Sequence, residues 1–352
     1  MDITPFLKLL IQKKGSDLFF TPNAPVKIKV EGVISSVGKM NLTPQQVEAA
    51  AYSIMYDRQR EEIKENLETD FAIELEEENA RFRVNAFRQR GEMAMVLRLI
   101  PNEIPTIESL GLPPVLKQLI MNRRGLILMV GATGSGKSTT LASMIAYRNR
   151  KMPGHILTIE DPIEFSHPNE QCIINQREVG VDTHSYASAL KSAMRESPDV
   201  IMIGEIRDRE TMATALELCN TGHLCISTLH ANNANQAMER VINLFPHESH
   251  KQLLMDLSVN LRAVLSQRLV TGVDSKRIPA VEVMINNPHI ADLILKGRLD
   301  EIKEAMQESG VGGMQTFDQA LFKLYEAGRI DMEEALSHAD SRNNFEALVN
   351  FA

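Results

Sequence analysis

Apolar residues in the first hundred positions follow two different periods. Ile3, Phe6, Leu7, Leu10 and Ile11 recur at helical spacing, which predicts an amphipathic helix packed on its own domain. Short runs rich in β-branched and aromatic residues predict strands. The predicted elements are hairpins over 26–30 with 33–37 and over 70–75 with 81–87, and a helix over 43–54. This mixture predicts a small α+β domain.

Prolines interrupt the pattern after Ile100 and predict a connection between two domains. From Val115 onward, helical segments alternate with apolar runs that are typical of strands in a mostly parallel sheet. The predicted strands cover 126–130, 155–159, 200–203 and 224–227, and helices such as 290–295 and 317–325 dominate after about residue 285. We expect an N-terminal domain over 1–100, a linker over 101–114, an α/β core over 115–285 and a helical C-terminal region over 286–352.

Composition and charge narrow the class of protein. The chain has 352 residues, 43% of them hydrophobic, which is enough for two cores. Its net charge of -8 disfavours nucleic acid as a partner, because that affinity comes from neutralising phosphates with Lys and Arg. Cys172, Cys219 and Cys225 form no C-x-x-C pair, so we expect buried thiols in a reducing compartment and no zinc site. No apolar run approaches the ~18 residues that span a bilayer, so we expect no membrane insertion.

Residues 131–139 carry the strongest chemical signal. They read Gly-Ala-Thr-Gly-Ser-Gly-Lys-Ser-Thr, which satisfies the pattern G-x-x-x-x-G-K-[ST] between a predicted strand and a predicted helix over 139–147. In such a loop, backbone N–H groups and the helix N-terminus bind phosphate oxygens. Lys137 is expected to reach the β- and γ-phosphates, and Ser138 to ligate Mg²⁺. The predicted nucleotide-binding residues are Gly131, Ala132, Thr133, Gly134, Ser135, Gly136, Lys137, Ser138 and Thr139.

Carboxylates follow two of the predicted strands. Glu205 ends the apolar run 200–203 and is expected to act on Mg²⁺, through water because it is longer than the usual aspartate. Glu160 and Glu164 lie in one short loop after 155–159, with Asp161 and Pro162 between them. We favour Glu164 as the general base or water-positioning group, and Glu160 as support for the metal or the loop. A loop without catalytic function is the alternative interpretation.

A histidine and several arginines complete the candidate set. His230 follows the predicted strand 224–229 on the expected ligand side, where a ring N–H is placed to sense a γ-phosphate, whereas His223 precedes that strand and is interpreted as structural. Positive charge gathers late in the first domain at Arg81, Arg83, Arg88, Arg90 and Arg98. These arginines either stabilise a transferring phosphoryl group from another domain or subunit, or pair with the acids of their own domain.

Taken together, these motifs resemble those of the secretion-ATPase superfamily. The matching segments are G-A-T-G-S-G-K-S-T, I-E-D-P-I-E-F, D-V-I-M-I-G-E-I-R-D and T-G-H-L-C-I-S-T-L-H-A-N-N-A, and similarity extends to 15–18, 81–87 and 313–318. Within the superfamily the chain is similar to the type IV pilus retraction ATPases, the PilT/PilU family. Segments 176–180, 230–237 and 291–297 resemble its accessory, PilU-like branch.

This resemblance implies a PAS-like α+β domain joined to a RecA-like P-loop ATPase domain with a helical C-terminal extension. It implies a ring of six identical chains that uses ATP and Mg²⁺ for pilus retraction in twitching motility. Glu164 and Glu205 match the family's catalytic glutamates, His230 falls within its histidine box, and Arg83 and Arg98 match its arginine positions. The implied partners are a principal retraction ATPase and the inner-membrane platform protein, which would place the chain in the cytoplasm at the inner-membrane pilus base.

Two departures from the family pattern qualify the resemblance. Phe19 stands where many relatives carry histidine, and 287–292 replaces the arginine-containing A-I-R segment of the principal motors, which predicts ATP hydrolysis with weak retraction by this chain alone. A pilus-extension or type II secretion ATPase is a second interpretation, but the cysteines supply no four-cysteine zinc module. A nucleotide-binding scaffold is a third, and intact Lys137, Glu164 and Glu205 argue against it.

Overall fold

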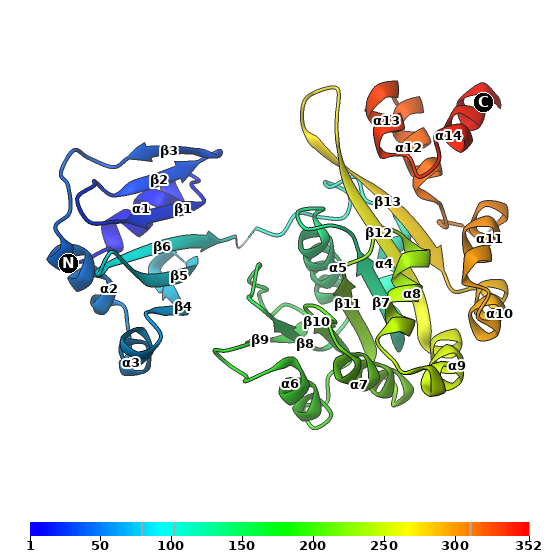
Figure 1. Ribbon diagram of the computed structural model, residues 1–352, viewed down its shortest axis with the longest axis horizontal. Coiled ribbons are helices and arrows are strands. Elements are labelled where there is room, and N and C mark those ends of the chain that lie inside the picture. The colour runs from blue at the N-terminus through cyan, green and yellow to red at the C-terminus, as the bar shows by residue number, and fades with distance from the viewer. Residues whose placement is uncertain (79, 102, 310–311, 352) are drawn as a thin grey trace. The chain divides into compact units, whose positions relative to one another are not determined.

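The computed structural model describes residues 1–78, 80–101, 103–309 and 312–351. The chain divides into two compact units (Figure 1). The first unit comprises Met1–Glu103 and Glu164–Ser166, and the second comprises Ile104–Ile163 and His167–Ala352. Asn102 of the predicted linker, and Gly310, Val311 and Ala352 of the predicted C-terminal region, lie outside the described residues.

The first unit is built on a six-stranded antiparallel sheet in the order β3-β2-β1-β6-β5-β4. Its strands are β1 (Asp17–Phe20), β2 (Lys27–Val30), β3 (Val33–Ser36), β4 (Glu68–Leu75), β5 (Ala80–Gln89) and β6 (Glu92–Ile100). Its helices are α1 (Thr4–Gln12), α2 (Pro44–Ser53) and α3 (Asp57–Glu65), with a 3-10 turn η1 (Glu76–Glu78). Both predicted hairpins and both predicted helices are present, so the α+β prediction is confirmed.

Local sequence explains these elements. Leu7 and Leu10 of α1 are buried, as the helical spacing predicts. The Thr43 side chain accepts a hydrogen bond from the Gln46 N–H and forms a capping box that starts α2. The β2–β3 turn consists of Glu31 and Gly32, which both have positive φ angles (49° and 83°), as a two-residue hairpin turn of type I′ requires.

The second unit contains a seven-stranded sheet in the order β13-β12-β7-β11-β10-β8-β9. Its strands are β7 (Gly125–Val130), β8 (Gly154–Glu160), β9 (Cys172–Glu178), β10 (Val200–Ile203), β11 (Leu224–Leu229), β12 (Leu261–Thr271) and β13 (Arg277–Ile285). Every neighbouring pair is parallel except β12 with β13. The prediction of a mostly parallel sheet is therefore confirmed, although β9, β12 and β13 are not among the predicted strands.

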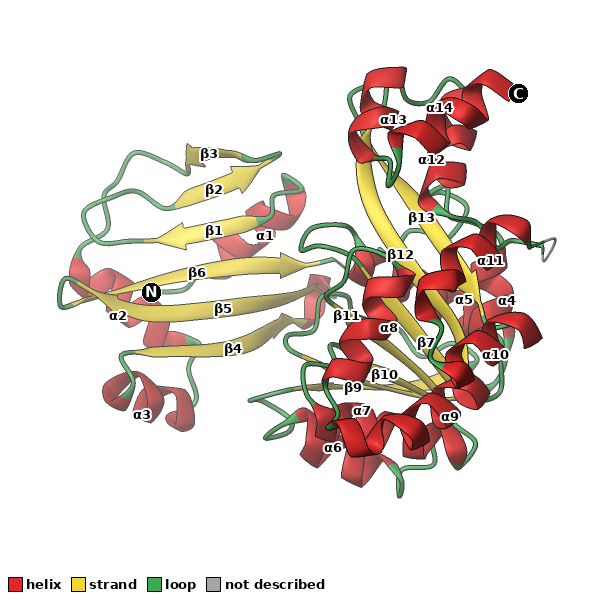
Figure 2. Cartoon of the chain, turned by 45° about the vertical axis from the view of Figure 1, so that its right-hand side comes forward, coloured by secondary structure: helices red, strands yellow, loops and turns green. Residues whose placement is uncertain are grey.

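Helices cover both faces of this sheet (Figure 2). They are α4 (Val115–Ile120), α5 (Lys137–Lys151), α6 (Tyr186–Ala193), α7 (Arg209–Asn220), α8 (Ala234–Asn243), α9 (His250–Asn260), α10 (Pro288–Lys296), α11 (Ile302–Glu308), α12 (Phe317–Glu326), α13 (Met332–His338) and α14 (Arg342–Phe351), with 3-10 turns η2 (His247–Ser249) and η3 (Leu299–Glu301). Leu126 and Leu128 pack toward α6–α11, whereas Ile127 and Met129 pack toward α4 and α5. This alternation explains why β7 is a continuous apolar run: both of its faces are buried.

The C-terminal helices form a separate core on the β12–β13 hairpin. Val270 and Ile278 of the two strands pack with Leu321 of α12, Ala335 of α13 and Phe345 of α14. Figure 1 shows α12, α13 and α14 beside the end of this hairpin. The helical region predicted after residue 285 is thus present, and it is anchored to the sheet that carries the phosphate loop.

Two further sequence expectations concern the cysteines and the membrane. Cys172, Cys219 and Cys225 are all buried free thiols, as expected. Among the residues that the structure describes, none of the helices is long and apolar enough to cross a membrane.

Candidate functional site

The phosphate-binding pattern lies between the central strand β7 and helix α5. β7 is buried along its whole length between β11 and β12, and α5 begins at Lys137. A side chain at Gly131 would place its Cβ 2.5 Å from the Gln267 carbonyl oxygen, and one at Gly136 would approach the Gln267 Nε2 at 2.8 Å. Both glycines also have positive φ angles (150° and 87°). The loop therefore takes its shape from residues without side chains, which brings backbone N–H groups close to any ligand.

Two polar side chains of the loop suit an anionic ligand. The Lys137 ammonium donates to the carbonyl oxygens of Gly131 (2.8 Å) and Ala132 (3.0 Å), so its charge lies over the loop. Within the described part of the chain, the buried Ser135 hydroxyl oxygen has no hydrogen-bond partner. A buried polar atom without a partner is costly, and a phosphate oxygen would satisfy it. Ser138, in the first turn of α5, is partly exposed and remains the predicted Mg²⁺ ligand.

The order of strands in the sheet determines how far each of the other predicted residues lies from the loop. Parallel strands end at the same edge of the sheet, and from the loop outward their order is β7, β11, β10, β8. His230 follows the adjacent strand β11, Glu205 follows β10, and Glu160 ends β8. Neighbouring strands are about 4.8 Å apart, so Glu205 is better placed than Glu160 to share a metal ion with Ser138.

Glu205 and His230 contact one another. The His230 Nε2 lies 3.1 Å from Glu205 Oε1, and the Arg207 Nε donates to Glu205 Oε2 at 2.8 Å. The Glu205 side chain is only 14% exposed, so both carboxylate oxygens are held in fixed directions. The hydrogen bond to Glu205 also raises the pKa of Arg207, which keeps that guanidinium charged. The predicted phosphate sensor and the predicted metal-associated glutamate thus form one pair.

Arg207 and Tyr186 are neighbours of this pair that sequence reasoning missed. Arg207 stands inside the motif D-V-I-M-I-G-E-I-R-D, so its position two residues after Glu205 was a usable signal. Tyr186, the first residue of α6, approaches Gly204 so closely that a Cβ there would meet the phenol oxygen at 2.7 Å. Burial raises the pKa of Tyr186, so its hydroxyl stays protonated. No sequence pattern marks this tyrosine.

Two side chains of β9 bind the backbone of the loop on either side of Glu164. The Gln176 side chain accepts from the His167 N–H (2.8 Å) and donates to Glu160 Oε1 (3.1 Å). The Glu178 carboxylate accepts from the Ile163 N–H (3.2 Å). Glu160 is buried and also accepts from the Thr158 hydroxyl at 2.7 Å, which favours its supporting role for the loop.

Glu164, the predicted catalytic base, is more exposed to solvent than the β9 side chains that hold its loop. Glu164 is exposed and counts with the first unit, whereas the flanking Ile163 and His167 belong to the second. Sequence reasoning missed Gln176 and Glu178, because β9 was not among the predicted strands. Their spacing of two residues puts them on one face of that strand.

Arg83 and Arg98 lie opposite one another on β5 and β6 of the first unit. Asp17 on β1 is in register with Arg98 and accepts from its Nε at 2.8 Å. The Arg83 Nε lies 3.9 Å from Asp70 Oδ1. The Arg98 and Arg83 side chains remain 65% and 37% exposed, so a buried acid and two accessible guanidinium groups share one face of the sheet. The role of this pair at the phosphate loop stays a prediction.

The other three arginines of the first domain lie elsewhere. Arg81 pairs with Glu74 at 3.6 Å, and Arg88 pairs with Glu48 of α2 at 3.1 Å. Arg90 is exposed in the β5–β6 turn. Salt bridges within the domain therefore account for Arg81 and Arg88.

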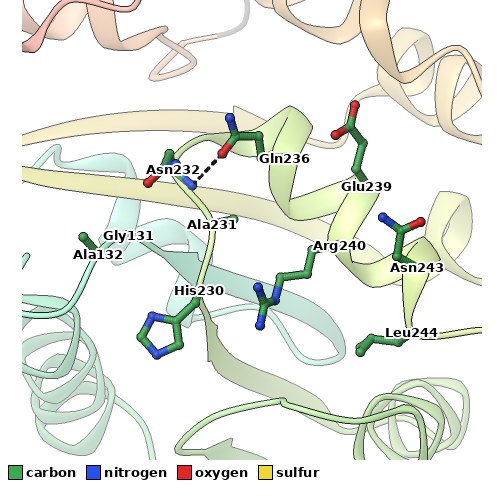
Figure 3. Close-up of a pocket in the computed structure, with 10 residues that line it drawn as sticks. All are labelled: Gly131, Ala132, His230, Ala231, Asn232, Gln236, Glu239, Arg240, Asn243 and Leu244. Carbon is green, nitrogen blue, oxygen red and sulfur yellow. Dashed lines mark hydrogen bonds between the residues drawn. The ribbon is translucent and has the colours of Figure 1, made fainter.

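A cleft of about 670 Å³ opens beside the phosphate loop, between the loop and α8. Figure 3 shows the Arg240 side chain extending from α8 toward His230. The cleft is lined by Gly131, Ala132, His230, Ala231, Asn232, Gln236, Glu239, Arg240, Asn243 and Leu244. Its polar lining continues the site from the phosphate loop along the segment that follows β11.

Comparison with known proteins identifies the family to which the chain belongs. The family of type II/IV secretion system proteins matches residues 1–335. The type IV pilus ATPase PilU of Pseudomonas aeruginosa is 51% identical over 99% of this chain and 91% of its own, and the type IV pilus retraction ATPase PilT of the same organism is 43% identical over 98% and 100%. The crystal structure of the pilus retraction motor PilT with bound ADP superposes with a TM-score of 0.92 at 40% identity, covering 99% of both chains. The Legionella pneumophila ATPase DotB gives 0.82 at 26% identity, covering 99% and 95%.

Proposed function

Because the chain belongs to the type II/IV secretion system protein family, we propose that it is an ATP-hydrolysing motor subunit for type IV pilus retraction. The observation that carries the proposal is the phosphate loop together with the Glu205–His230 pair at one sheet edge. The fold matches the structure of PilT with ADP nearly end to end, and the sequence similarity to PilU covers almost the whole chain. Both named relatives are pilus ATPases, which supports the same use of the site here.

ATP and Mg²⁺ fit the residues present. The loop of 131–139 would bind the phosphates through its backbone N–H groups, and Lys137 would exchange its carbonyl partners for phosphate oxygens. Ser138 and Glu205 would hold Mg²⁺, directly and through water respectively. The bound ion would neutralise charge on the β- and γ-phosphates.

The chain's own groups would then orient the attacking water. Glu164 is the proposed water-positioning base, held by the loop that Gln176 and Glu178 fix. His230 would report the γ-phosphate to Glu205 through their 3.1 Å contact. A histidine beside a carboxylate keeps a defined ring orientation, which makes it a suitable sensor.

We further propose that six copies form a ring and that Arg83 and Arg98 complete each nucleotide site. The two guanidinium groups are accessible and in register, so they are able to bind one anion together. Head-to-tail contacts between identical chains form a closed ring when the rotation from one chain to the next closes. The ring would act in the cytoplasm at the inner-membrane pilus base, against the platform protein.

The chain is proposed to work beside a principal retraction ATPase. The segment 287–292 lacks the arginine of the A-I-R motif, and in the structure Asn287 instead caps α10 by accepting from the Ile290 N–H at 2.9 Å. The helix start is therefore well formed but carries no guanidinium for a partner. Similarity to PilU supports the accessory assignment.

Steady-state ATP turnover by the full chain tests the enzymatic part of this proposal. Lys137→Ala should nearly abolish turnover, because it removes the cation that balances phosphate charge. Lys151→Ala, at the exposed other end of α5, is the matched control and should hydrolyse ATP like the parent. Equal turnover by a folded Lys137→Ala protein would contradict the proposal.

A further inference from the structure

Strand β12 touches the phosphate loop with one face. Gln267 is buried, its amide nitrogen donates to the Ser135 carbonyl oxygen at 2.8 Å, and its amide oxygen accepts from the Thr140 hydroxyl at 2.7 Å. Ser135 belongs to the loop and Thr140 to the first turn of α5. Gln267 therefore ties both ends of the phosphate-binding segment to β12.

The next residue, Arg268, points from the opposite face of the strand, as alternation requires. Its Nη2 donates to the Asn232 carbonyl oxygen at 3.3 Å, and its Nη1 donates to the His338 carbonyl oxygen at 2.6 Å. The same guanidinium pairs with Asp340 at 2.7 Å and lies 3.9 Å from the ring centroid of Phe317. One side chain thus contacts the segment after His230 and the C-terminal helices together.

The C-terminal partners of Arg268 belong to a buried polar network. Asp318 in α12 is 1% exposed, and its Oδ1 accepts from the Asp340 N–H at 2.8 Å. Lys303 in α11 lies 3.1 Å from Asp340 and 3.7 Å from Asp318. Two carboxylates and two cations balance one another here. Removing one member of such a network leaves the others uncompensated, so α11, α12 and the end of α13 hold their places jointly.

The contacts of Arg268 differ in length. Those to His338 and Asp340 are short, whereas the one to Asn232 is the longest of the three at 3.3 Å. Asn232 lines the cleft beside the phosphate loop, two residues after His230 (Figure 3). A small displacement of this segment would break or tighten that contact first, because it is already longer than the usual N–H···O hydrogen bond of roughly 2.7–3.2 Å.

We propose that Arg268 is a positioning residue that couples the segment 230–233 to the C-terminal helices α12 and α13. Through it, a displacement of the His230 segment on nucleotide binding changes the position of the helices at the end of the β12–β13 hairpin. The inference rests on the proposed nucleotide site. It adds a structural connection from that site to the C-terminal helices, and the residues of this connection lie outside the phosphate-binding pattern.

Hydrogen exchange of the full-length protein tests the coupling, with Mg²⁺ and a non-hydrolysable ATP analogue as the probe. In the parent, the probe should slow exchange at 131–139, and change it at both 230–234 and 332–341. In Arg268→Lys, which keeps the charge but loses the planar fork, the change at 332–341 should be lost, while that at 230–234 persists. In the parent, the probe should change the exchange rate at 332–341 by about 5-fold or more, which corresponds to the lower end of coupling free energies between sites. This change is the one that Arg268→Lys should lose.

Controls separate this coupling from simple anchoring. Arg277→Lys changes an exposed arginine on the paired strand β13 and should respond like the parent. If Arg268→Lys does not fold, Asp340→Asn tests the same link from its other end and should give the same selective loss. In addition, kcat for ATP per folded molecule should fall in the variant with little change in KM, whereas a merely structural role would lower the folded fraction and leave kcat per folded molecule unchanged.

Each outcome decides the proposal. Persistence of the nucleotide response at 332–341 in Arg268→Lys or Asp340→Asn would overturn it, as would absence of that response in the parent. If the probe fails to protect 131–139 in the parent, the proposed nucleotide site itself is wrong and the inference falls with it. Protection at 131–139 without a response at 332–341 would contradict the coupling alone.

Discussion

His230 Nε2 lies 3.1 Å from Glu205 Oε1, across the neighbouring ends of β11 and β10. The contact joins two residues that sequence patterns assign to separate tasks, and it implies that they act as a unit. His230→Gln and Glu205→Gln should each lower kcat by about 10-fold or more, and the double variant should fall little below the worse single variant.

His223→Gln is the matched control for this cycle. His223 precedes β11, so it lies at the opposite strand end, where its Nδ1 contacts the Leu218 carbonyl oxygen at 3.0 Å. The control should turn over ATP like the parent. Fully additive losses in the double variant would show that His230 and Glu205 work independently.

Glu164→Gln should lower kcat by about 100-fold with a nearly unchanged KM for ATP, because the amide keeps the shape but does not accept a proton from water. Glu205→Gln should instead raise the Mg²⁺ concentration needed for half-maximal turnover. Turnover measured across ATP and Mg²⁺ titrations separates the two roles. Glu170→Gln, an exposed change six residues further on, serves as the control, and near-parental kinetics for Glu164→Gln would remove it from the catalytic set.

Arg83→Ala and Arg98→Ala should both reduce turnover. Arg83→Ala should do so with little loss of thermal stability, because the pair of Arg83 with the exposed Asp70 contributes little to folding. Arg98→Ala should also lower thermal stability, because it leaves the buried Asp17 carboxylate without its guanidinium partner. Arg88→Ala is the control, since Arg88 lies on β5 as Arg83 does but pairs with Glu48 of α2. Parental turnover should also rise with protein concentration as rings assemble. Concentration-independent turnover by a monodisperse monomer would contradict the ring requirement.

Glu282 on β13 predicts a pH-dependent stability. Burial raises its pKa to about 7, although its Oε1 accepts from the Ala234 N–H (2.8 Å) and the Ser266 hydroxyl (2.9 Å); nearby Asp340 raises the pKa further and Lys303 lowers it. The folded-state pKa lies above the ordinary 4.5. Its contribution to stability is therefore fully present below pH 4.5 and is lost as the pH rises through 7.

Glu282→Gln should remove this pH dependence, because the amide is neutral and still accepts both hydrogen bonds. The variant should gain up to about 3 kcal/mol over the parent above neutral pH and nothing near pH 4.5, as urea midpoints measured at several pH values would show. Glu326→Gln, at an exposed position of α12, should follow the parent. Parallel pH profiles for parent and Glu282→Gln would refute the assignment.

Local patterns predicted the parts of the fold that depend on neighbouring residues. The phosphate loop, its strand and its helix are specified within 126–151, and the alternation of helices with apolar runs indicated a parallel sheet. β12 and β13 were missed because most positions on both of their faces are buried, which hides the two-residue alternation of a half-exposed strand. An apolar run of that kind is compatible with either a helix or a strand.

The site was predictable only where chemistry and sequence position coincide. Lys137, Glu205 and His230 stand directly in or after predicted elements, so the sequence alone offered each of them as a candidate. Gln267 and Arg268 were not, because their roles depend on β12 lying beside β7 and on the C-terminal helices returning to it. The order of strands in a sheet is a property of the whole fold, and no local motif encodes it.

Pilus retraction in living cells tests the central claim most directly. Retraction events should be counted by microscopy in cells whose principal retraction ATPase is catalytically inactive, with this chain present as the parent or as Lys137→Ala. The account predicts that the parent restores retraction and that Lys137→Ala does not. Equal retraction with the parent and with Lys137→Ala would contradict the claim that ATP hydrolysis by this chain drives pilus retraction.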